Sequence, residues 1–354
     1  MKRSFYSYSF DELEKLLSDN GLNKYGARLL FNWFYKKKNR GLPSGLAKKT
    51  ISYLNENMNF DLPVLIGEES VIENHQNSTQ KFLIQFDDLR RVECVLIPFQ
   101  GKYTLCLSSQ VGCAMKCSFC YTGTQGLSRN LVAEEIVGQL MSAHRWLRDK
   151  VENLKISNIV FMGQGEPLHN FEAVEKACSI FLSQYGLSIG REKITISTAG
   201  YLPGLRKWLA SGLNVNLAFS LHSIKDRVRD ELIPLNKAYP IQEILELLKD
   251  WPLESKRFIT FEYLLIKELN DSEEDALALG NRLKDFAALI NLIPFNPFPG
   301  SSYQRPSDQV INQFHQSLSK FSIPTMIRKT KGDQILAACG QLNSSKGLSP
   351  NFSQ

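Results

Sequence analysis

The feature that most constrains the fold is an alternation of short apolar runs with helical stretches over the last two thirds of the chain. Apolar, β-rich runs occur at residues 103–107, 156–162, 193–197, 215–220, 258–265 and 289–294. Helical patterns separate them, for example over 133–146, 171–182 and 241–250. Strand, helix and strand at this spacing predict a parallel sheet with right-handed connections. Because six units are fewer than the eight of a closed barrel, we predict a partial (β/α)6 barrel.

Ahead of this region the pattern is first helical and then strand-like. Ser9 and Glu12 are spaced as a capping box that opens a short helix, and a second helical stretch covers residues 25–38. The alternation in KFLIQF and VECVLIPF predicts strands. We therefore predict an α/β chain with four parts: a small N-terminal helical domain (1–65), a β-rich connector (66–102), the barrel (103–342) and a polar tail (343–354).

Positive charge is concentrated near the N-terminus. Residues 1–60 hold 11 Lys and Arg against five Asp and Glu, which accounts for the whole net charge of +6. Lys36, Lys37, Lys38 and Arg40 belong to this excess. A polyanion such as RNA is a natural partner for such a segment, although a solvated helix face gives the same pattern. The charge thus supports an RNA-binding accessory domain without establishing one.

Targeting signals and cysteine usage bear on the compartment. The first residues, MKRSFYSYSFDELEK, are too polar for a signal peptide, and no apolar run approaches the length of a membrane span. The seven cysteines are an odd number, which argues against a disulfide framework. These features predict a cytoplasmic protein that has no membrane partner.

Three cysteines crowd into one short segment, Cys113-x3-Cys117-x2-Cys120. Three thiolates leave one iron of a [4Fe–4S] cluster without a protein ligand, whereas clusters that only carry electrons usually have four. A structural zinc site is the alternative, but zinc usually adds a second pair of ligands, and His144 stands alone downstream. The spacing favours a cluster with an open iron, and it is similar to the signature of the radical S-adenosylmethionine (SAM) superfamily. There the amino and carboxylate groups of SAM chelate that iron.

Polar residues follow the predicted strands where parallel sheets bind ligands. They are Gly163, Gly165 and Glu166 after the second strand, Ser197 at the third, Ser220, Leu221 and His222 at the fourth, and Asn296 after the sixth. Each has an ordinary structural explanation: a turn, a helix cap, a core histidine or an Asn-Pro turn. Their recurrence at equivalent strand ends instead predicts one ligand cradle.

Longer stretches carry a resemblance to a known family. They are VECVLIP, CLSSQVGCAMKCSFC, QGLSRNL, MGQGEPL, ITISTAG, FSLHS, NLIPFNPFPGSSYQRPS and RKTKGDQILAACGQL. The chain resembles the RlmN/Cfr family of radical SAM RNA methyltransferases, and NLIPFNPFPGSSY and RKTKGD are similar to its RlmN branch. Tyr121 departs from the pattern, because Ala or Ser is expected after the third cysteine.

The resemblance assigns roles to individual residues. It implies that Cys113, Cys117 and Cys120 bind the [4Fe–4S] cluster. It implies SAM contacts for Gly165, Glu166, Ser197, Ser220, Leu221, His222 and Asn296. Cys339 falls on the cysteine that carries the methyl group, Cys106 on the one that resolves the covalent intermediate, and Glu93 on the proton acceptor. Cys94 and Cys178 match no role and are predicted to be buried apolar residues.

The implied reaction explains why two more cysteines are needed, because an electrophilic ring carbon cannot attack a methyl sulfonium. Cys339 is methylated by one SAM, and a radical from a second SAM takes a hydrogen from that methyl group. The resulting carbon radical adds to the adenine, Glu93 accepts the ring proton, and Cys106 attacks the sulfur of Cys339 to free the product. A resting disulfide between Cys106 and Cys339 is left open.

The resemblance implies carbon 2 of adenosine 2503 in 23S rRNA as the target, with tRNA adenosine 37 left open as a second. Lys329 and Lys331 are predicted phosphate contacts. Carbon-8 methylation, another RNA, or a non-catalytic iron–sulfur RNA-binding protein are the alternatives. The chemistry also implies a reductase or flavodoxin-type electron donor, and we expect a monomer.

Overall fold

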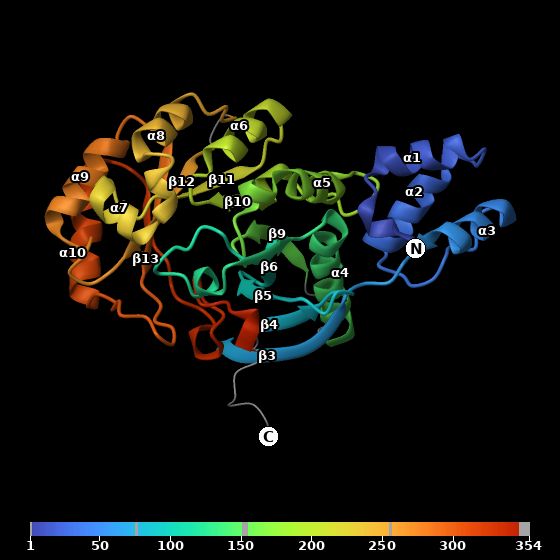
Figure 1. The fold of residues 1–354 in the computed structure, drawn as a ribbon, viewed down its shortest axis with the longest axis horizontal. Helices are drawn as coiled ribbons and strands as arrows, with labels where there is room; N and C mark the ends of the chain where they lie inside the picture. The colour runs from blue at the N-terminus through green and yellow to red at the C-terminus, as the bar shows by residue number, and fades with distance from the viewer. Residues whose placement is uncertain (1, 75–76, 151–154, 255–256, 347–354) are drawn as a thin grey trace, which may run out of the picture.

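A computed structural model describes residues 2–74, 77–150, 155–254 and 257–346. Within these residues the main sheet has ten strands in the order β14-β13-β12-β11-β10-β9-β6-β5-β4-β3. The sheet curves through the larger lobe of the molecule, with helices on its outer side (Figure 1). The predicted α/β class is confirmed.

Seven neighbouring strands of this sheet run parallel. They are β6 (Lys102–Cys106), β9 (Ile156–Phe161), β10 (Ile194–Thr198), β11 (Asn216–Ser220), β12 (Ile259–Leu265), β13 (Ala288–Pro294) and β14 (Thr325–Ile327). The first six are the strands that the sequence predicts, and a helix follows each of them. Strand β14 was not predicted, because three residues after Pro324 are too few to show an alternating pattern.

The helices between the strands bury one apolar face each against the sheet. They are α4 (Ala133–Lys150), α5 (Phe171–Leu182), α6 (Leu202–Ser211), the short α7 (Asp226–Leu232), α8 (Ile241–Lys249), α9 (Glu273–Leu283) and α10 (Asp308–Ser319). Cys178 on α5 is fully buried, as predicted. Six β/α units with a seventh strand therefore form the partial barrel.

The β-rich connector continues the same sheet. Its strands β3 (Val64–Asn74), β4 (Asn77–Gln85) and β5 (Arg91–Phe99) are antiparallel, and β5 also pairs antiparallel with β6. Glu69 lies opposite Lys81, Lys81 opposite Val95, and Val95 opposite Cys106. Because directly opposite residues share a face, this row brings buried charges of the connector to the face that holds Cys106.

The N-terminal helices form a smaller lobe, on the right in Figure 1. They are α1 (Phe10–Asp19), α2 (Gly26–Phe31), the π-helical turn η2 (Asn32–Lys36) and α3 (Lys48–Asn57). The predicted capping box is confirmed, since Ser9 N–H donates to Glu12 over 2.8 Å and Glu12 N–H donates to the Ser9 hydroxyl over 3.3 Å. Phe10 stacks on Tyr185 at 4.0 Å between ring centres, which fixes this lobe to the turn after α5.

The chain after β14 folds back over the connector. Ile335, Ala337 and Leu342 are buried against Val95 and Cys106. Asn343 and Ser344 are buried as well. The segment that carries Cys339 is thus packed onto the edge of the barrel, and residues 347–354 of the predicted tail lie outside the described residues.

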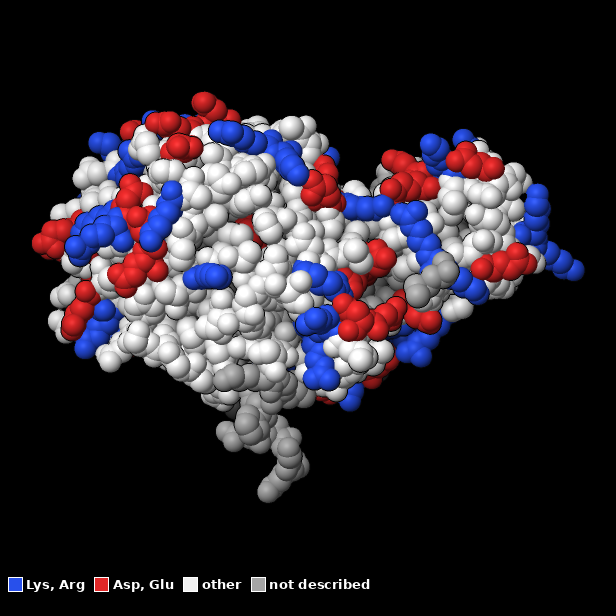
Figure 2. Space-filling model, viewed as in Figure 1, with Lys and Arg blue, Asp and Glu red and all other residues white. Residues whose placement is uncertain are grey.

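Charged side chains are unevenly spread over the face seen in Figure 2. They gather around its border and over the N-terminal lobe, while the middle of the larger lobe is mostly uncharged. Among the described residues, none of the helices combines the length and the apolar character that crossing a bilayer requires.

Candidate active site

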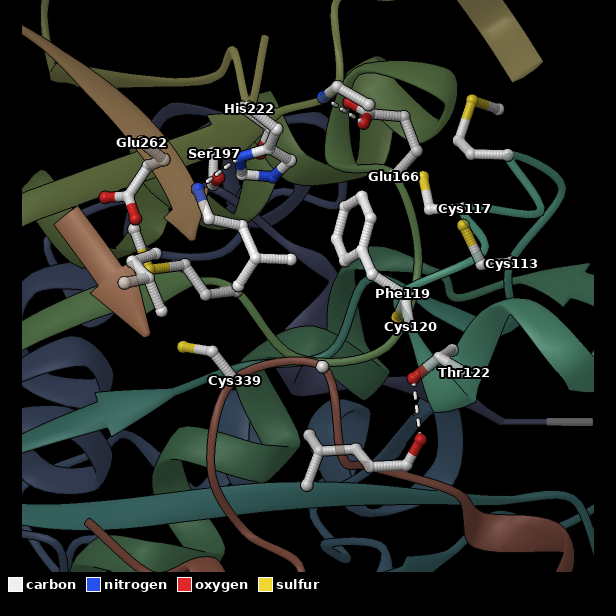
Figure 3. Close-up of a pocket in the computed structure, with 18 of the residues that line it drawn as sticks. Cys113, Cys117, Phe119, Cys120, Thr122, Glu166, Ser197, His222, Glu262 and Cys339 are labelled. Atoms are coloured by element: carbon white, nitrogen blue, oxygen red, sulfur yellow. Dashed lines mark hydrogen bonds between the residues drawn. The ribbon is translucent and has the colours of Figure 1, made fainter. Parts of the chain in front are cut away.

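One pocket at the carboxyl ends of the parallel strands gathers most of the predicted site residues (Figure 3). We call it the cysteine pocket. Its lining includes Cys113, Cys117, Cys120, Gly165, Glu166, Ser197, Ser220, His222, Asn296 and Cys339. These residues come from six separate stretches of sequence, so the fold alone brings them together.

The three clustered cysteines lie on a loop after the short strand β7 (Gln110–Gly112), which pairs with β8 (Leu127–Asn130). The loop is tied to α7, because Ser118 N–H donates to the Leu232 carbonyl over 3.0 Å. Within the loop, Cys120 N–H donates to the Cys117 carbonyl over 3.1 Å. Backbone hydrogen bonds of Cys117, Ser118 and Cys120 therefore hold the loop in place.

Burial makes these thiols hard to ionise by themselves. It raises the pKa of Cys113 to about 12 and also raises the pKa of Cys117 and Cys120. A metal centre removes that penalty, because thiolate ligation releases the proton. No group of three or more His, Cys, Asp or Glu side chains in the described ranges is arranged to hold a metal ion. The assignment of these thiols to a cluster therefore stays a prediction.

The glycine-rich turn after β9 shapes one wall of the pocket. A Cβ on Gly163 would lie 2.6 Å from the Leu107 carbonyl oxygen, and one on Gly165 would lie 2.6 Å from the Gln110 side chain. Gly165 also has a φ of +104°, which other residues rarely adopt. Only glycine fits at these two positions, because the turn packs tightly against the chain at Leu107 and Gln110.

Glu166 supplies the carboxylate of this wall. Its Oε1 accepts the Leu168 N–H over 3.0 Å, and its Oε2 accepts the Ala199 N–H over 2.8 Å. Burial raises the pKa of Glu166 to about 7, although these hydrogen bonds oppose the shift. A cationic ligand in the pocket would stabilise its ionised form.

Ser197 and His222 are placed by strand ends. Ser197 lies in β10, while the N-cap of the next helix is Tyr201, so Ser197 is not a helix cap. His222 Nδ1 accepts the Leu264 N–H over 3.1 Å, and burial lowers the pKa of His222 to about 3. The neutral ring then carries its proton on Nε2, as a donor. Leu221 is fully buried in the core, and neither pocket described here includes it.

Cys339 also borders a second pocket, which we call the Cys106 pocket. Cys106, Cys339, Arg328, Lys329 and Lys331 are among its lining residues. Burial raises the pKa of Cys106 to about 12 and raises that of Cys339, while the Arg328 guanidinium opposes the shift of Cys339. All cysteines are free thiols here, so the resting disulfide that the sequence leaves open is absent from the described residues.

Among the described residues that line the two pockets, Glu93 is not included. Its Oε2 accepts the Asn343 N–H over 2.7 Å, and its Oε1 is 3.3 Å from Lys81 Nζ. Lys81 Nζ is also 2.7 Å from Glu69 Oε2. Burial raises the pKa of Glu93, and Lys81 is the largest opposing influence. This buried triad was not visible in the sequence.

Glu262, Arg328 and Phe119 are among the lining residues that were not predicted from the sequence. Glu262 and Arg328 border both pockets, with Arg328 Nη1 4.0 Å from Glu262 Oε2. Glu262 could have been identified from the sequence as a candidate site residue, because a carboxylate within the apolar run FEYLL is unusual. Phe119 projects into the cysteine pocket, where its ring is perpendicular to that of His222, with ring centres 4.7 Å apart (Figure 3).

Comparison with known proteins gives concordant matches. Residues 107–280 match the family model of the radical SAM superfamily. The chain is 42% identical to a dual-specificity RNA methyltransferase RlmN of Bradyrhizobium sp. (strain BTAi1), over 97% of this chain and 89% of the relative. It is 39% identical to the protein of the same name from Bdellovibrio bacteriovorus, over 97% of this chain and 84% of that one.

A solved structure shows the same fold. The chain superposes on a radical SAM methyltransferase from Sphaerobacter thermophilus with a TM-score of 0.88 and 36% identity. The match covers 96% of this chain and 99% of the solved one. The N-terminal helices, connector and barrel therefore follow the architecture of that methyltransferase.

Proposed function

Because this chain belongs to the RlmN family of radical SAM RNA methyltransferases, we propose that it methylates carbon 2 of an adenine in RNA. Adenosine 2503 of 23S rRNA is the proposed target, and adenosine 37 of tRNA the second. The observation that carries the proposal is the position of Cys339. It alone among the cysteines borders both the cysteine pocket and the Cys106 pocket, within the described residues.

Membership of the radical SAM superfamily implies a [4Fe–4S] cluster and SAM as cofactors. Cys113, Cys117 and Cys120 would hold the cluster, and the pocket that they line has room beside them for a bound ligand. A cluster held there supplies the electron that cleaves SAM to a radical. Glu166 would then face the ligand ammonium, and Ser197, His222 and Asn296 would offer hydrogen bonds.

Cys339 and Cys106 have different proposed roles in the reaction. Cys339 carries the methyl group on sulfur, so that a carbon radical and not a methyl cation meets the electrophilic ring. Arg328 favours its thiolate, the form that can be methylated. Asn296 donates to the Cys339 carbonyl over 3.3 Å and fixes that backbone. Cys106 then resolves the adduct by forming a disulfide with Cys339.

The Cys106 pocket is the proposed place for the target base. Phe99 and Ile97 give it apolar surface, while Arg328, Lys329 and Lys331 give it positive charge. Lys331 Nζ donates to the Pro98 carbonyl over 2.5 Å, whereas Lys329 is exposed. We propose that Lys329 contacts an RNA phosphate and that Lys331 braces the pocket wall.

Glu93 is the proposed acceptor of the ring proton. Leu342 lines both pockets, and the next residue, Asn343, donates to Glu93. The Glu93 carboxylate thus lies behind residues 342–343, on the side of this segment that faces away from the two pockets. Proton transfer requires that this segment shift when RNA binds, which would also release the hydrogen bond to Glu93.

Other partners follow from the reaction. We propose a reductase or flavodoxin-type electron donor, a monomeric enzyme, and the cytoplasm, where rRNA and tRNA are modified. The predicted domains are proposed as functional units, with residues 1–65 as the RNA-binding accessory domain.

Mass spectrometry of the modified nucleoside tests the function. Cluster-loaded protein is incubated anaerobically with SAM, a reductant and unmodified 23S rRNA or tRNA, and the RNA is digested. We expect 2-methyladenosine. Formation of 8-methyladenosine would replace the proposal by the carbon-8 alternative, and unmodified RNA bound by a cluster-loaded protein would favour the non-catalytic one.

A further inference from the structure

Three charged side chains of the connector are buried together beneath the Cys339 segment. Lys81 on β4 is in contact with Glu69 on β3 over 2.7 Å and with Glu93 on β5 over 3.3 Å. The exposed fractions of Lys81, Glu69 and Glu93 are 2%, 3% and 1%. Such groups are almost never fully buried unless they are paired, so this arrangement needs a reason.

The charge balance of the triad suggests one. With Lys81 protonated and both carboxylates ionised, the triad carries one net negative charge. Uptake of one proton would make it neutral inside a region of low dielectric constant. A buried ion pair of Lys81 with Glu93 alone would already be neutral and would resist a proton. The second carboxylate, Glu69, is what leaves the triad able to accept one.

We propose that Lys81 and Glu69 are positioning residues that set the basicity of Glu93 by sharing one buried positive charge between two carboxylates. The inference rests on the proposed function, in which Glu93 takes the ring proton. In that step the adenine C–H bond breaks, its electron pair stays with the ring, and the proton forms an O–H bond on Glu93. Lys81 keeps Glu93 ionised before the proton arrives. Glu69 shares the charge of Lys81 and so weakens its attraction to the Glu93 carboxylate, which leaves Glu93 able to take up the proton.

The surroundings of Glu93 contain no other charged group that any described contact brings to its carboxylate. The C-terminal segment contributes the neutral Asn343 N–H. Gln164, from the turn after β9, accepts the backbone N–H of Glu93 over 2.8 Å. Cys94 is the adjacent thiol, and burial raises its pKa, so it remains neutral. Burial is the largest influence on the pKa of Glu93, and Lys81 and Glu69 are the charged groups that act on it.

Two substitutions are expected to shift the pKa of Glu93 in opposite directions. Lys81→Met removes the opposite charge, which raises the pKa of Glu93, so the acidic limb of kcat/KM against pH moves to higher pH. Glu69→Gln removes the like charge, which lowers that pKa, so the limb moves to lower pH. We expect each limb to move by about one pH unit.

A purely structural triad would not give shifts of opposite sign. Lys81→Arg keeps the charge and should restore most of the activity. Lys207→Met is the matched control, because Lys207 forms an exposed pair with Glu172 far from the triad, and its profile should equal that of the parent. If Lys81→Met fails to fold, Glu69→Gln remains, since it removes one of two buried like charges and leaves an ion pair.

An infrared titration separates this inference from the proposed function. The Glu93 carboxyl band is identified in the cluster-loaded protein by difference from Glu93→Gln and titrated without RNA. Opposite pKa shifts in the two variants support the inference even if the RNA product differs from the proposed one. Equal pKa values in the parent and both variants, with RNA methylation intact, would overturn the inference and leave the function standing.

Discussion

Tyr121 donates its backbone N–H to the Gly340 carbonyl over 2.6 Å, which joins the residue after Cys120 to the residue after Cys339. Thr122 reinforces this link, because its hydroxyl donates to the Leu342 carbonyl over 2.7 Å. The cysteine loop and the Cys339 segment are more than 200 residues apart in the sequence. Their direct connection fixes where the Cys339 sulfur lies relative to the other three thiols.

The Tyr121 ring should matter for this link. It stacks on Phe298 with ring centres 5.1 Å apart and is 5% exposed. Tyr121→Ala should lower the free energy of unfolding by about 3 kcal/mol through the cavity it leaves. It should also speed hydrogen exchange over residues 339–344, measured by mass spectrometry.

Tyr25→Ala provides the control for this prediction, because Tyr25 is 70% exposed and should change stability by no more than about 0.5 kcal/mol. Unchanged exchange over residues 339–344 in Tyr121→Ala would show that the stack does not support the Cys339 segment.

His144 should make the protein less stable in mild acid. It is buried on α4, away from both pockets as described, and burial lowers its pKa to about 3. The unfolded chain takes up a proton as the pH falls through about 6.5, whereas the folded protein does not. This group should therefore cost about 2 kcal/mol of stability between pH 6.5 and pH 5.

His144→Gln should remove that part of the pH dependence. Chemical denaturation of both proteins at several pH values measures it. Parallel stability curves for the parent and the variant would mean that His144 is protonated in the folded state.

The N-terminal lysines should contribute to RNA affinity through phosphates. Lys36 and Lys37 belong to the lobe that holds the excess positive charge. Replacing both with Ala should weaken binding of the RNA substrate and lower the slope of log affinity against log salt by about 1 per lysine. Filter binding over a range of salt concentrations measures both.

Lys249→Ala is the control for the salt experiment, because Lys249 is an exposed lysine at the end of α8, on the other lobe (Figure 1). An equal loss of slope in this variant would show that the N-terminal lysines act only through net charge.

Much of the fold could be read from the sequence, because its signals are local. The apolar period predicted six parallel strands, and the helix predicted over residues 171–182 has those bounds in the structure. The clustered cysteines and the strand-end residues were predicted to meet, because parallel strands end at one edge of a sheet. The structure places most of them in one pocket.

The parts of the fold and of the site that were not predicted depend on contacts between segments that are distant in the sequence. Glu69, Lys81 and Glu93 form a triad only through the pairing register of three antiparallel strands. The connector looked like a separate part, and only hydrogen bonding between β5 and β6 shows that it extends the barrel sheet. Leu221 was predicted among the ligand contacts, but its side chain packs in the core, which leaves its backbone for any contact.

The position of Cys339 between two pockets is the central claim, and Cys106→Ala tests it most directly. Cluster-loaded Cys106→Ala is incubated with SAM, reductant and RNA, and the products are digested and analysed by mass spectrometry. We predict a covalent RNA adduct on the peptide that contains Cys339, and none when Cys339→Ala is added. Free methylated RNA from Cys106→Ala, or ordinary turnover by Cys339→Ala, would contradict the account.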